Sequence, residues 1–159
     1  EKTKLHPMFA ACYHQEIVDT SIMTGYTSHF PGHRDKGFVY QAIFVPLTER
    51  VFYTFIATPH DWKVQQDAES HRQYLRWKDS LSGSEMTKIT NFETSFQKEA
   101  QLHMKVNVET RIFLNQLGSV LAFPANTCYH ATVMPGITTV NGVMASRDLL
   151  IIHPLELTT

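Results

Sequence analysis

The chain has 159 residues, of which 43% are hydrophobic, and this is enough to bury one sizeable core. We therefore expect a single domain over residues 1–159, with no room for a separate cofactor-binding module. Fourteen basic and 15 acidic residues leave a formal net charge of −1, without a long run of either sign. This balance gives no strong signal for nucleic acid or an acidic lipid surface as a partner.

The sequence contains no stretch typical of a membrane span or a signal peptide. No segment approaches the ~18 consecutive apolar residues that a span needs, and the N-terminus lacks an apolar core. Cys12 and Cys128 are far apart, so a disulfide framework is not expected. We expect an intracellular protein, in the cytoplasm, nucleus or an organellar matrix. Because the first residue is Glu1 rather than Met, an N-terminal element of a longer parent protein stays open.

The first third of the chain predicts strands. Residues 9–18 and 21–30 mix β-branched, aromatic and small polar residues without a helical apolar repeat. Residues 38–46 and 51–58 are aromatic or β-branched almost throughout, which is typical of strands covered on both faces. The second and third of these segments are separated by FPGHRDKG, in which Pro-Gly predicts a turn and His-Arg-Asp lies at a loop or strand edge.

The composition changes over residues 60–105, where charged and amide residues are frequent. Helix formers over residues 65–78, with apolar residues in one stripe, predict a helix that ends near Gly83. A second, short helix is predicted over residues 93–103. The insertion also contains three large aromatic residues, Trp62, Tyr74 and Trp77. They either cover a substrate mouth as a lid or pack as a satellite core, since functional loops often lie on a rigid scaffold.

Strand patterns resume after the insertion and continue to the last apolar run. A turn is predicted at Leu117-Gly118-Ser119. The predicted strands are residues 106–114, 120–124, 127–134 and 149–152. Eight or so short strands with turn signals and one polar insertion predict a mainly β domain, a β-sandwich or a small barrel.

One constellation of side chains points to metal chemistry. His33 and Asp35 are two residues apart, so in extended chain they lie on one face and can reach one ion. The best third ligand is His130, a polar residue in the predicted strand 127–134. Two histidines and one carboxylate leave coordination positions open, which suits Fe(II) that binds a bidentate cosubstrate together with oxygen.

An arginine follows at Arg147, 17 residues after His130 (147 − 130 = 17) and close to the last apolar strand. The planar guanidinium group suits bidentate binding of a carboxylate. Fe(II) chelated by the keto-acid end of 2-oxoglutarate, with Arg147 holding the other end, accounts for these four residues together.

The order of HxD, a long gap, His and then Arg on the last strand resembles the 2-oxoglutarate and iron(II)-dependent dioxygenase superfamily. That family folds as a double-stranded β-helix, or jelly roll. The segment LGSVLAFP, residues 117–124, is similar to the family's turn and strand before the distal histidine, and IFVPL, residues 43–47, is similar to the strand after HxD. The resemblance covers roughly residues 14–154, although Leu149 stands where many members have Ser.

The resemblance implies a jelly roll with a helical insertion around residues 60–105. It also implies that His33, Asp35 and His130 bind Fe(II), that Arg147 anchors 2-oxoglutarate, and that ascorbate serves as a reductant. Tyr26 would donate its hydroxyl to the cosubstrate, or serve only in packing. Oxidative decarboxylation to succinate and carbon dioxide would accompany hydroxylation, or demethylation by way of hydroxylation, of an unidentified substrate.

Two other interpretations stay open at this point. The first is a cupin-like metalloprotein that uses three or more histidines and no 2-oxoglutarate. The second is a catalytically silent jelly-roll binding module, in which His33 and His130 would lie apart. Rival ligands for the metal are His29, His103 and His153. The sequence leaves the oligomeric state undetermined.

Overall fold

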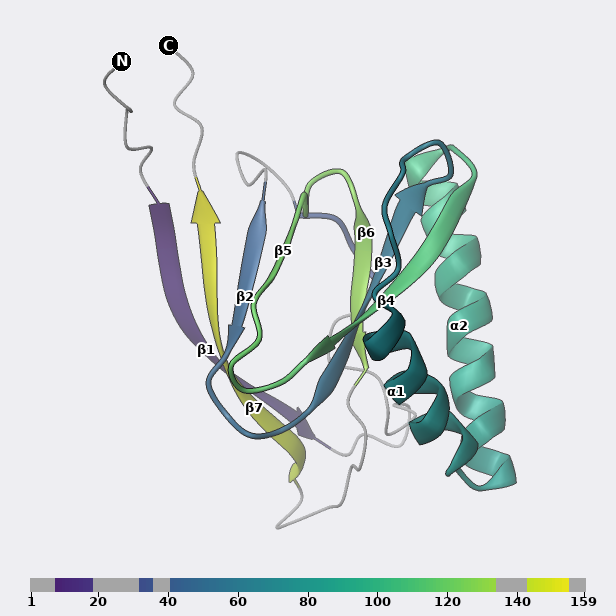
Figure 1. The fold of residues 1–159 in the computed structure, drawn as a ribbon, viewed down its shortest axis with the longest axis horizontal. Coiled ribbons are helices and arrows are strands. Elements are labelled where there is room, and N and C mark those ends of the chain that lie inside the picture. The colour runs from purple at the N-terminus through teal and green to yellow at the C-terminus, as the bar shows by residue number, and fades with distance from the viewer. Residues whose placement is uncertain (1–7, 19–31, 36–40, 134–142, 155–159) are drawn as a thin grey trace.

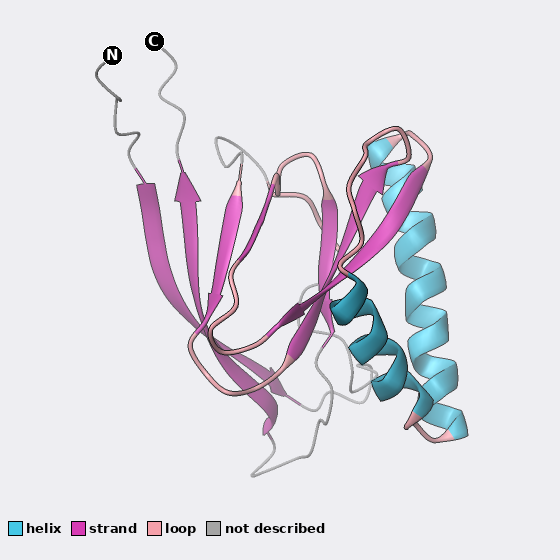
Figure 2. Ribbon diagram, in the orientation of Figure 1, coloured by secondary structure: helices cyan, strands magenta, loops and turns pink. Residues whose placement is uncertain are grey.

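The computed structural model describes residues 8–18, 32–35, 41–133 and 143–154 (Figure 1). The described elements are, in chain order, β1 (Met8–Val18), β2 (Ala42–Pro46), β3 (Phe52–Pro59), α1 (Ala68–Asp79), α2 (Gly83–Met104), β4 (Val108–Asn115), β5 (Leu121–Phe123), β6 (Tyr129–Val133) and β7 (Val143–Pro154). The strands form two antiparallel sheets, and both helices lie on one side of the molecule (Figure 2). Sheet A has the strand order β1-β7-β2-β5, and sheet B has the order β4-β3-β6. The prediction of a mainly β protein is therefore confirmed.

Most predicted strands agree with the structure within a few residues, but the last strand is much longer than predicted. The pattern indicated residues 149–152, whereas β7 begins at Val143. Its first half has only the short apolar run Val143-Met144-Ala145, and it is extended because β1 pairs with it from Met8 opposite Pro154 to Val18 opposite Val143. The predicted strand over residues 21–30 lies outside the described residues.

Strand β3 lies at the centre of the molecule and is buried on both faces, as its composition predicted. Phe52 and Ile56 pack between the two sheets in a cluster with side chains from β2, β5 and β7. Tyr53, Phe55 and Ala57 point the other way and pack under the helices. The period of two along β3 thus separates two cores, one between the sheets and one between sheet B and the helices.

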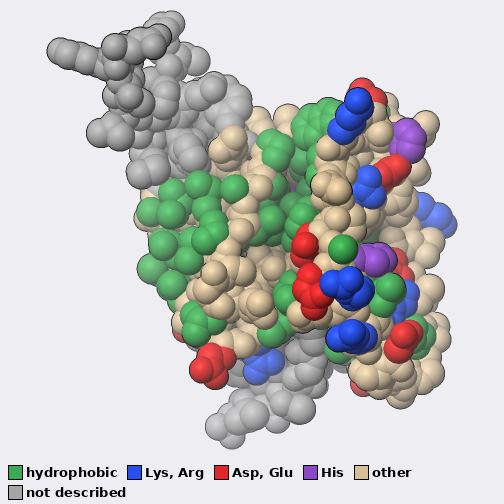
Figure 3. Space-filling model, viewed as in Figure 1, with side chains coloured by type: hydrophobic (Ala, Val, Ile, Leu, Met, Phe, Trp, Pro, Cys, Tyr) green, Lys and Arg blue, Asp and Glu red, His purple; other side chains and the backbone are tan. Residues whose placement is uncertain are grey.

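Strand β2 differs from the prediction because it is buried on one face only. Ala42 and Phe44 are buried between the sheets, whereas Ile43 and Val45, on the other face, are only half-buried. The helices pack against sheet B and leave the outer face of sheet A without a helical cover among the described residues. Figure 3 shows hydrophobic side chains gathered on the β2 and β7 side of the molecule and charged side chains over the helices.

Helix α1 is fixed to sheet B by its aromatic residues. It begins after Asp67, whose carboxylate accepts a hydrogen bond from the Ser70 amide at 2.8 Å. Tyr74 packs edge-on against Tyr53, with ring centroids 5.2 Å apart, and Trp77 stacks on the same ring at 5.8 Å. Of the two interpretations of the aromatic residues, packing therefore holds for Tyr74 and Trp77.

Helix α2 begins ten residues before the predicted start at residue 93. Gly83 is its first residue and not a stop signal, because Ser82 and Glu85 form a capping box that satisfies the first free amides. The helix buries Ile89, Phe96 and Ala100 against sheet B. Neither helix of the described residues combines the length and the apolar character that a membrane crossing requires.

The capping box makes Ser82 a measurable contributor to the stability of α2. Ser82→Ala should lower the free energy of unfolding by about 1 kcal/mol, because the Glu85 amide loses its acceptor. Urea denaturation measures the difference. Ser95→Ala, at an exposed position in the middle of the same helix, should change stability by less than about 0.5 kcal/mol. Equal effects of the two substitutions would contradict the assigned start of α2.

Candidate metal centre

The backbone brings the HxD segment against the strand that carries the distal histidine. His33 and His130 form an isolated antiparallel bridge, in which the amide of each donates to the carbonyl of the other at 2.9 and 2.8 Å. The Asp35 amide donates to the carbonyl of Ala125 at 3.0 Å. Residues 32–35 thus run along β6 at the edge of sheet B, and residues 95 positions apart (130 − 35 = 95) become neighbours.

The side chains of the three predicted ligands come together at this bridge. Oδ1 of Asp35 lies 3.5 Å from Nε2 of His33 and 3.9 Å from Nε2 of His130. One ligand atom from each residue can be chosen so that all three lie within 4.8 Å of one another. Ligands bonded to one ion at about 2.1 Å are about 3 to 4 Å apart, so the cluster fits a single metal ion with small adjustments.

His130 is held in the form that a metal ligand requires. Its Nδ1 lies 3.1 Å from the carbonyl oxygen of Cys128, and because a carbonyl only accepts, Nδ1 carries the hydrogen and Nε2 keeps its lone pair. Burial, and then the neighbouring His33, lower the pKa of His130 to about 4, against the opposing effects of the Cys128 carbonyl and Asp35. The imidazole is therefore neutral at pH 7 and able to bind a cation.

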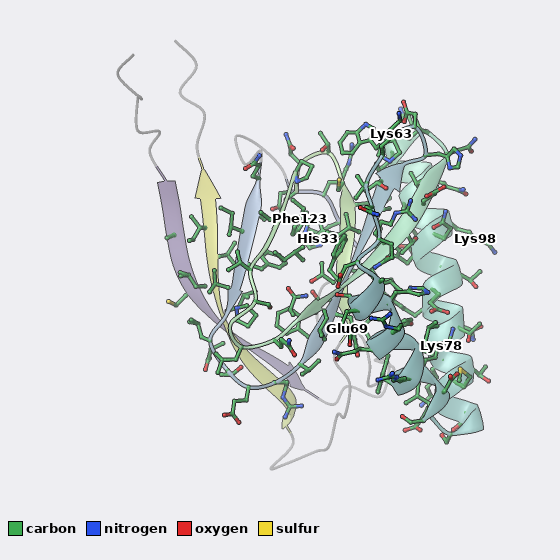
Figure 4. All side chains as sticks on the ribbon, viewed as in Figure 1. His33, Lys63, Glu69, Lys78, Lys98 and Phe123 are labelled. Carbon is green, nitrogen blue, oxygen red and sulfur yellow. The ribbon has the colours of Figure 1, made fainter. Side chains whose placement is uncertain are left out.

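The cluster is closed on one side and open on the other. The His130 side chain is 5% exposed, while Asp35 is 23% and His33 43% exposed. Phe123 of β5 packs its ring edge-on against His130 at 4.9 Å, and the stick view places Phe123 and His33 close together between the sheets (Figure 4). An ion here would be shielded from water on the His130 side and reached from the His33 side.

Two residues beside the cluster were missed by the sequence interpretation. Tyr129 lies on the other face of β6 from His130 and packs towards α2. A Cβ built on Gly32 would lie 2.2 Å from Cε1 of the Tyr129 ring, so this position accepts only glycine unless the ring moves. The Pro-Gly pair indicated a turn, and no local pattern reveals that a ring from residue 129 crosses it.

The other predicted site residues are placed only in part. Arg147 lies in β7 with its backbone opposite Gln15, and its side chain lies outside the described residues. Tyr26 and the rival ligand His29 also lie outside the described residues, as does the side chain of His153. The remaining rival, His103, stacks on the ring of Tyr129 at 5.2 Å, on the helical side of sheet B and away from the cluster.

The lowered pKa of His130 predicts a loss of stability in acid for the metal-free protein. The folded-state pKa is about 4, below the ordinary value of about 6.5 in the unfolded chain, so below pH 6.5 the proton binds preferentially to the unfolded chain. Between about pH 7 and about pH 4.5, the wild type should lose about 2 kcal/mol more of its unfolding free energy than His130→Gln does. Urea denaturation in the presence of a chelator measures this difference, and parallel losses in the two proteins would contradict it.

Comparisons with protein-family models, with curated proteins and with solved structures find no match for this chain. A functional conclusion therefore depends on the geometry of His33, Asp35 and His130 and on what surrounds them. That geometry is a candidate centre for one metal ion, with two imidazole ligands and one carboxylate ligand.

Proposed function

We propose that the protein is an iron(II)- and 2-oxoglutarate-dependent dioxygenase, with His33, Asp35 and His130 as the metal ligands. The observation that carries the proposal is the bridge between His33 and His130, which gathers the three side chains at one point. Two neutral nitrogens and one carboxylate on the same side of an ion leave positions open for a bidentate cosubstrate and oxygen. The separation expected for a silent binding module is not found, since the two imidazole centroids are 4.3 Å apart.

The order of the strands supports a jelly roll as the scaffold of this site. From β2 onwards the chain crosses between the sheets four times, with β2 in sheet A, β3 and β4 in sheet B, β5 in A, β6 in B and β7 in A. Two antiparallel sheets connected by such crossings are the arrangement of jelly-roll proteins. We propose the double-stranded β-helix as the fold, with α1 and α2 as an insertion between β3 and β4.

Polar side chains buried between the sheets support a binding position for the cosubstrate next to the metal ligands. Thr54 and Asn115 are both fully buried, and Asn115 Nδ2 donates to Thr54 Oγ1 at 2.8 Å and to the Phe113 carbonyl at 3.1 Å. Asn115 Oδ1 is buried and has no hydrogen-bond partner among the described residues, and a buried acceptor left unpaired costs about 1–3 kcal/mol. Thr54 pairs with Thr132, two residues from His130 on the same face of β6, so this polar region adjoins the metal ligands.

Arg147 is the group that we propose to complete this region. Arg147 precedes the buried Leu149 by two positions in the same strand, β7. A guanidinium group there would bind the distal carboxylate of 2-oxoglutarate in a bidentate manner.

Bound Fe(II) and 2-oxoglutarate would supply the oxidative chemistry, with O2 as the oxidant: one oxygen atom enters the cosubstrate, which becomes succinate and carbon dioxide, and the other enters a substrate C–H bond as a hydroxyl group. The chain binds and orients these groups. The Cys128 carbonyl holds His130 in the correct tautomer, Asp35 offsets the charge of the cation, and Phe123 excludes water on the buried side. The substrate, still unidentified, would approach from the exposed His33 side, and ascorbate would keep the iron reduced.

Turnover of the cosubstrate tests the proposal directly. Purified protein with Fe(II), ascorbate and 2-oxoglutarate should form succinate even without the true substrate, through uncoupled turnover. His33→Ala and His130→Ala should each lower Fe(II) affinity by at least tenfold and abolish succinate formation, since each removes a ligand. His71→Ala, at an exposed position on α1, serves as the histidine control and should behave as the wild type. Absence of metal binding by the wild type would defeat the proposal.

Arg147 separates a 2-oxoglutarate enzyme from a cupin-like metalloprotein. Arg147→Met should raise the KM for 2-oxoglutarate at least tenfold and leave Fe(II) affinity unchanged, because a charge-assisted pair contributes more than about 1.4 kcal/mol. Steady-state kinetics and metal titration measure the two quantities. Arg76→Met, at an exposed position on α1, is the matched control. Succinate formation with an unchanged KM in Arg147→Met would exclude this role for the arginine.

A further inference from the structure

We propose that Tyr129 and Glu99 form a positioning clamp through which helix α2 holds His33 in place as a metal ligand. The inference deepens the proposed function, on which its metal-binding part depends. It assigns the helical insertion a role in the geometry of the site, in addition to covering sheet B. Neither residue is proposed to touch the metal or the substrate.

The Tyr129 ring contacts the residue that directly precedes His33. Gly32 directly precedes the ligand, and the Tyr129 ring lies across it so closely that a Cβ would be 2.2 Å from Cε1 and 2.7 Å from Cζ. Real Cβ atoms do not approach other atoms so closely, so the ring fills the space that any other residue at position 32 would need. Tyr129 thus limits the movement of the Gly32 backbone towards the helices.

Helix α2 holds the Tyr129 ring in place through three of its residues. The tyrosine hydroxyl donates to Oε2 of Glu99 at 2.8 Å. Phe96 packs against the ring with centroids 5.4 Å apart, and His103 stacks on it at 5.2 Å with an angle of 14° between the rings. Three residues spaced along one face of α2 therefore fix the ring, which is 2% exposed.

The contact between Tyr129 and Gly32 helps to position the ligand atoms of His33 and Asp35. Two backbone hydrogen bonds to His130 hold His33 against β6 and set its position along the edge of the sheet. The hydrogen bond from the Asp35 amide to the Ala125 carbonyl restrains one end of the segment, and the Tyr129 ring over Gly32 restrains the other. Both ends must be held for the His33 and Asp35 side chains to point at the same ion.

A second tyrosine supplies a matched control. The Tyr74 hydroxyl donates to Oε1 of Glu93 at 2.7 Å, so α1 and α2 are joined by the same kind of bond between buried tyrosine and glutamate. Tyr74 packs in the helical core against Tyr53 and Phe55 and does not contact the candidate metal centre. Tyr74→Phe therefore removes an equivalent hydrogen bond without disturbing the clamp.

The clamp is tested in the whole protein with two readouts. Co(II) titration followed by visible absorption reports the affinity and symmetry of the metal centre, and the imidazole NMR signals of His33 and His130 report the geometry of the metal-free protein. Tyr129→Phe and Glu99→Ala each remove the hydrogen bond between these two side chains. Each should weaken Co(II) binding by roughly tenfold, as loss of a residue that orients a ligand does, and shift the His33 signals. Tyr74→Phe should leave affinity, spectrum and signals unchanged.

A double substitution tests the contact over Gly32 independently of any metal. Gly32→Ala should destabilise the wild type, but much less in a Tyr129→Ala background, because the ring that a methyl group would meet is gone. Additive effects, or unchanged His33 signals in both Tyr129→Phe and Glu99→Ala, would overturn the clamp. If the wild type binds no Co(II), the proposed function fails, while the NMR signals and the double substitution still decide the clamp.

Discussion

The candidate site depends on one short backbone interaction, the pair of hydrogen bonds between His33 and His130. These bonds align four residues, 32–35, with the edge of sheet B and place a histidine of each segment on the same face. Antiparallel neighbours lie about 5 Å apart, close enough for both side chains to share one ion. Without this bridge, His33 and Asp35 would be an isolated HxD in a turn.

Strand β6 serves two purposes because its side chains alternate. His130 and Thr132 face the space between the sheets, whereas Tyr129, Ala131 and Val133 face the helices, and all five are buried. The same five residues therefore present a metal ligand to one core and a packing surface to the other. Burial on both sides also explains the low pKa of His130, because the surroundings disfavour a charged imidazole.

The helical insertion contacts the packing surface of β6 directly beside the candidate metal ligand. Helix α2 covers sheet B with Ile89, Phe96 and Ala100, and its Glu99 contacts the residue next to the candidate ligand. An insertion that is distant in sequence from HxD can in this way influence the HxD backbone. In the proposed enzyme, the protein's contribution is to hold ligands within small tolerances, and the second layer of contacts determines how well it does so.

Local patterns in the sequence determined a mainly β protein, the approximate position of most strands and the helical character of residues 60–105, because apolar periodicity depends on neighbouring residues. They also placed His33 and Asp35 on one face through the period of two. The tertiary structure decided the rest. The extension of β7 follows from pairing with β1, the need for glycine at position 32 follows from a ring 97 residues later (129 − 32 = 97), and the tautomer of His130 follows from a backbone carbonyl. The meeting of His33 with His130 is a non-local pairing, and its partner is selected by sheet register, which no local pattern encodes.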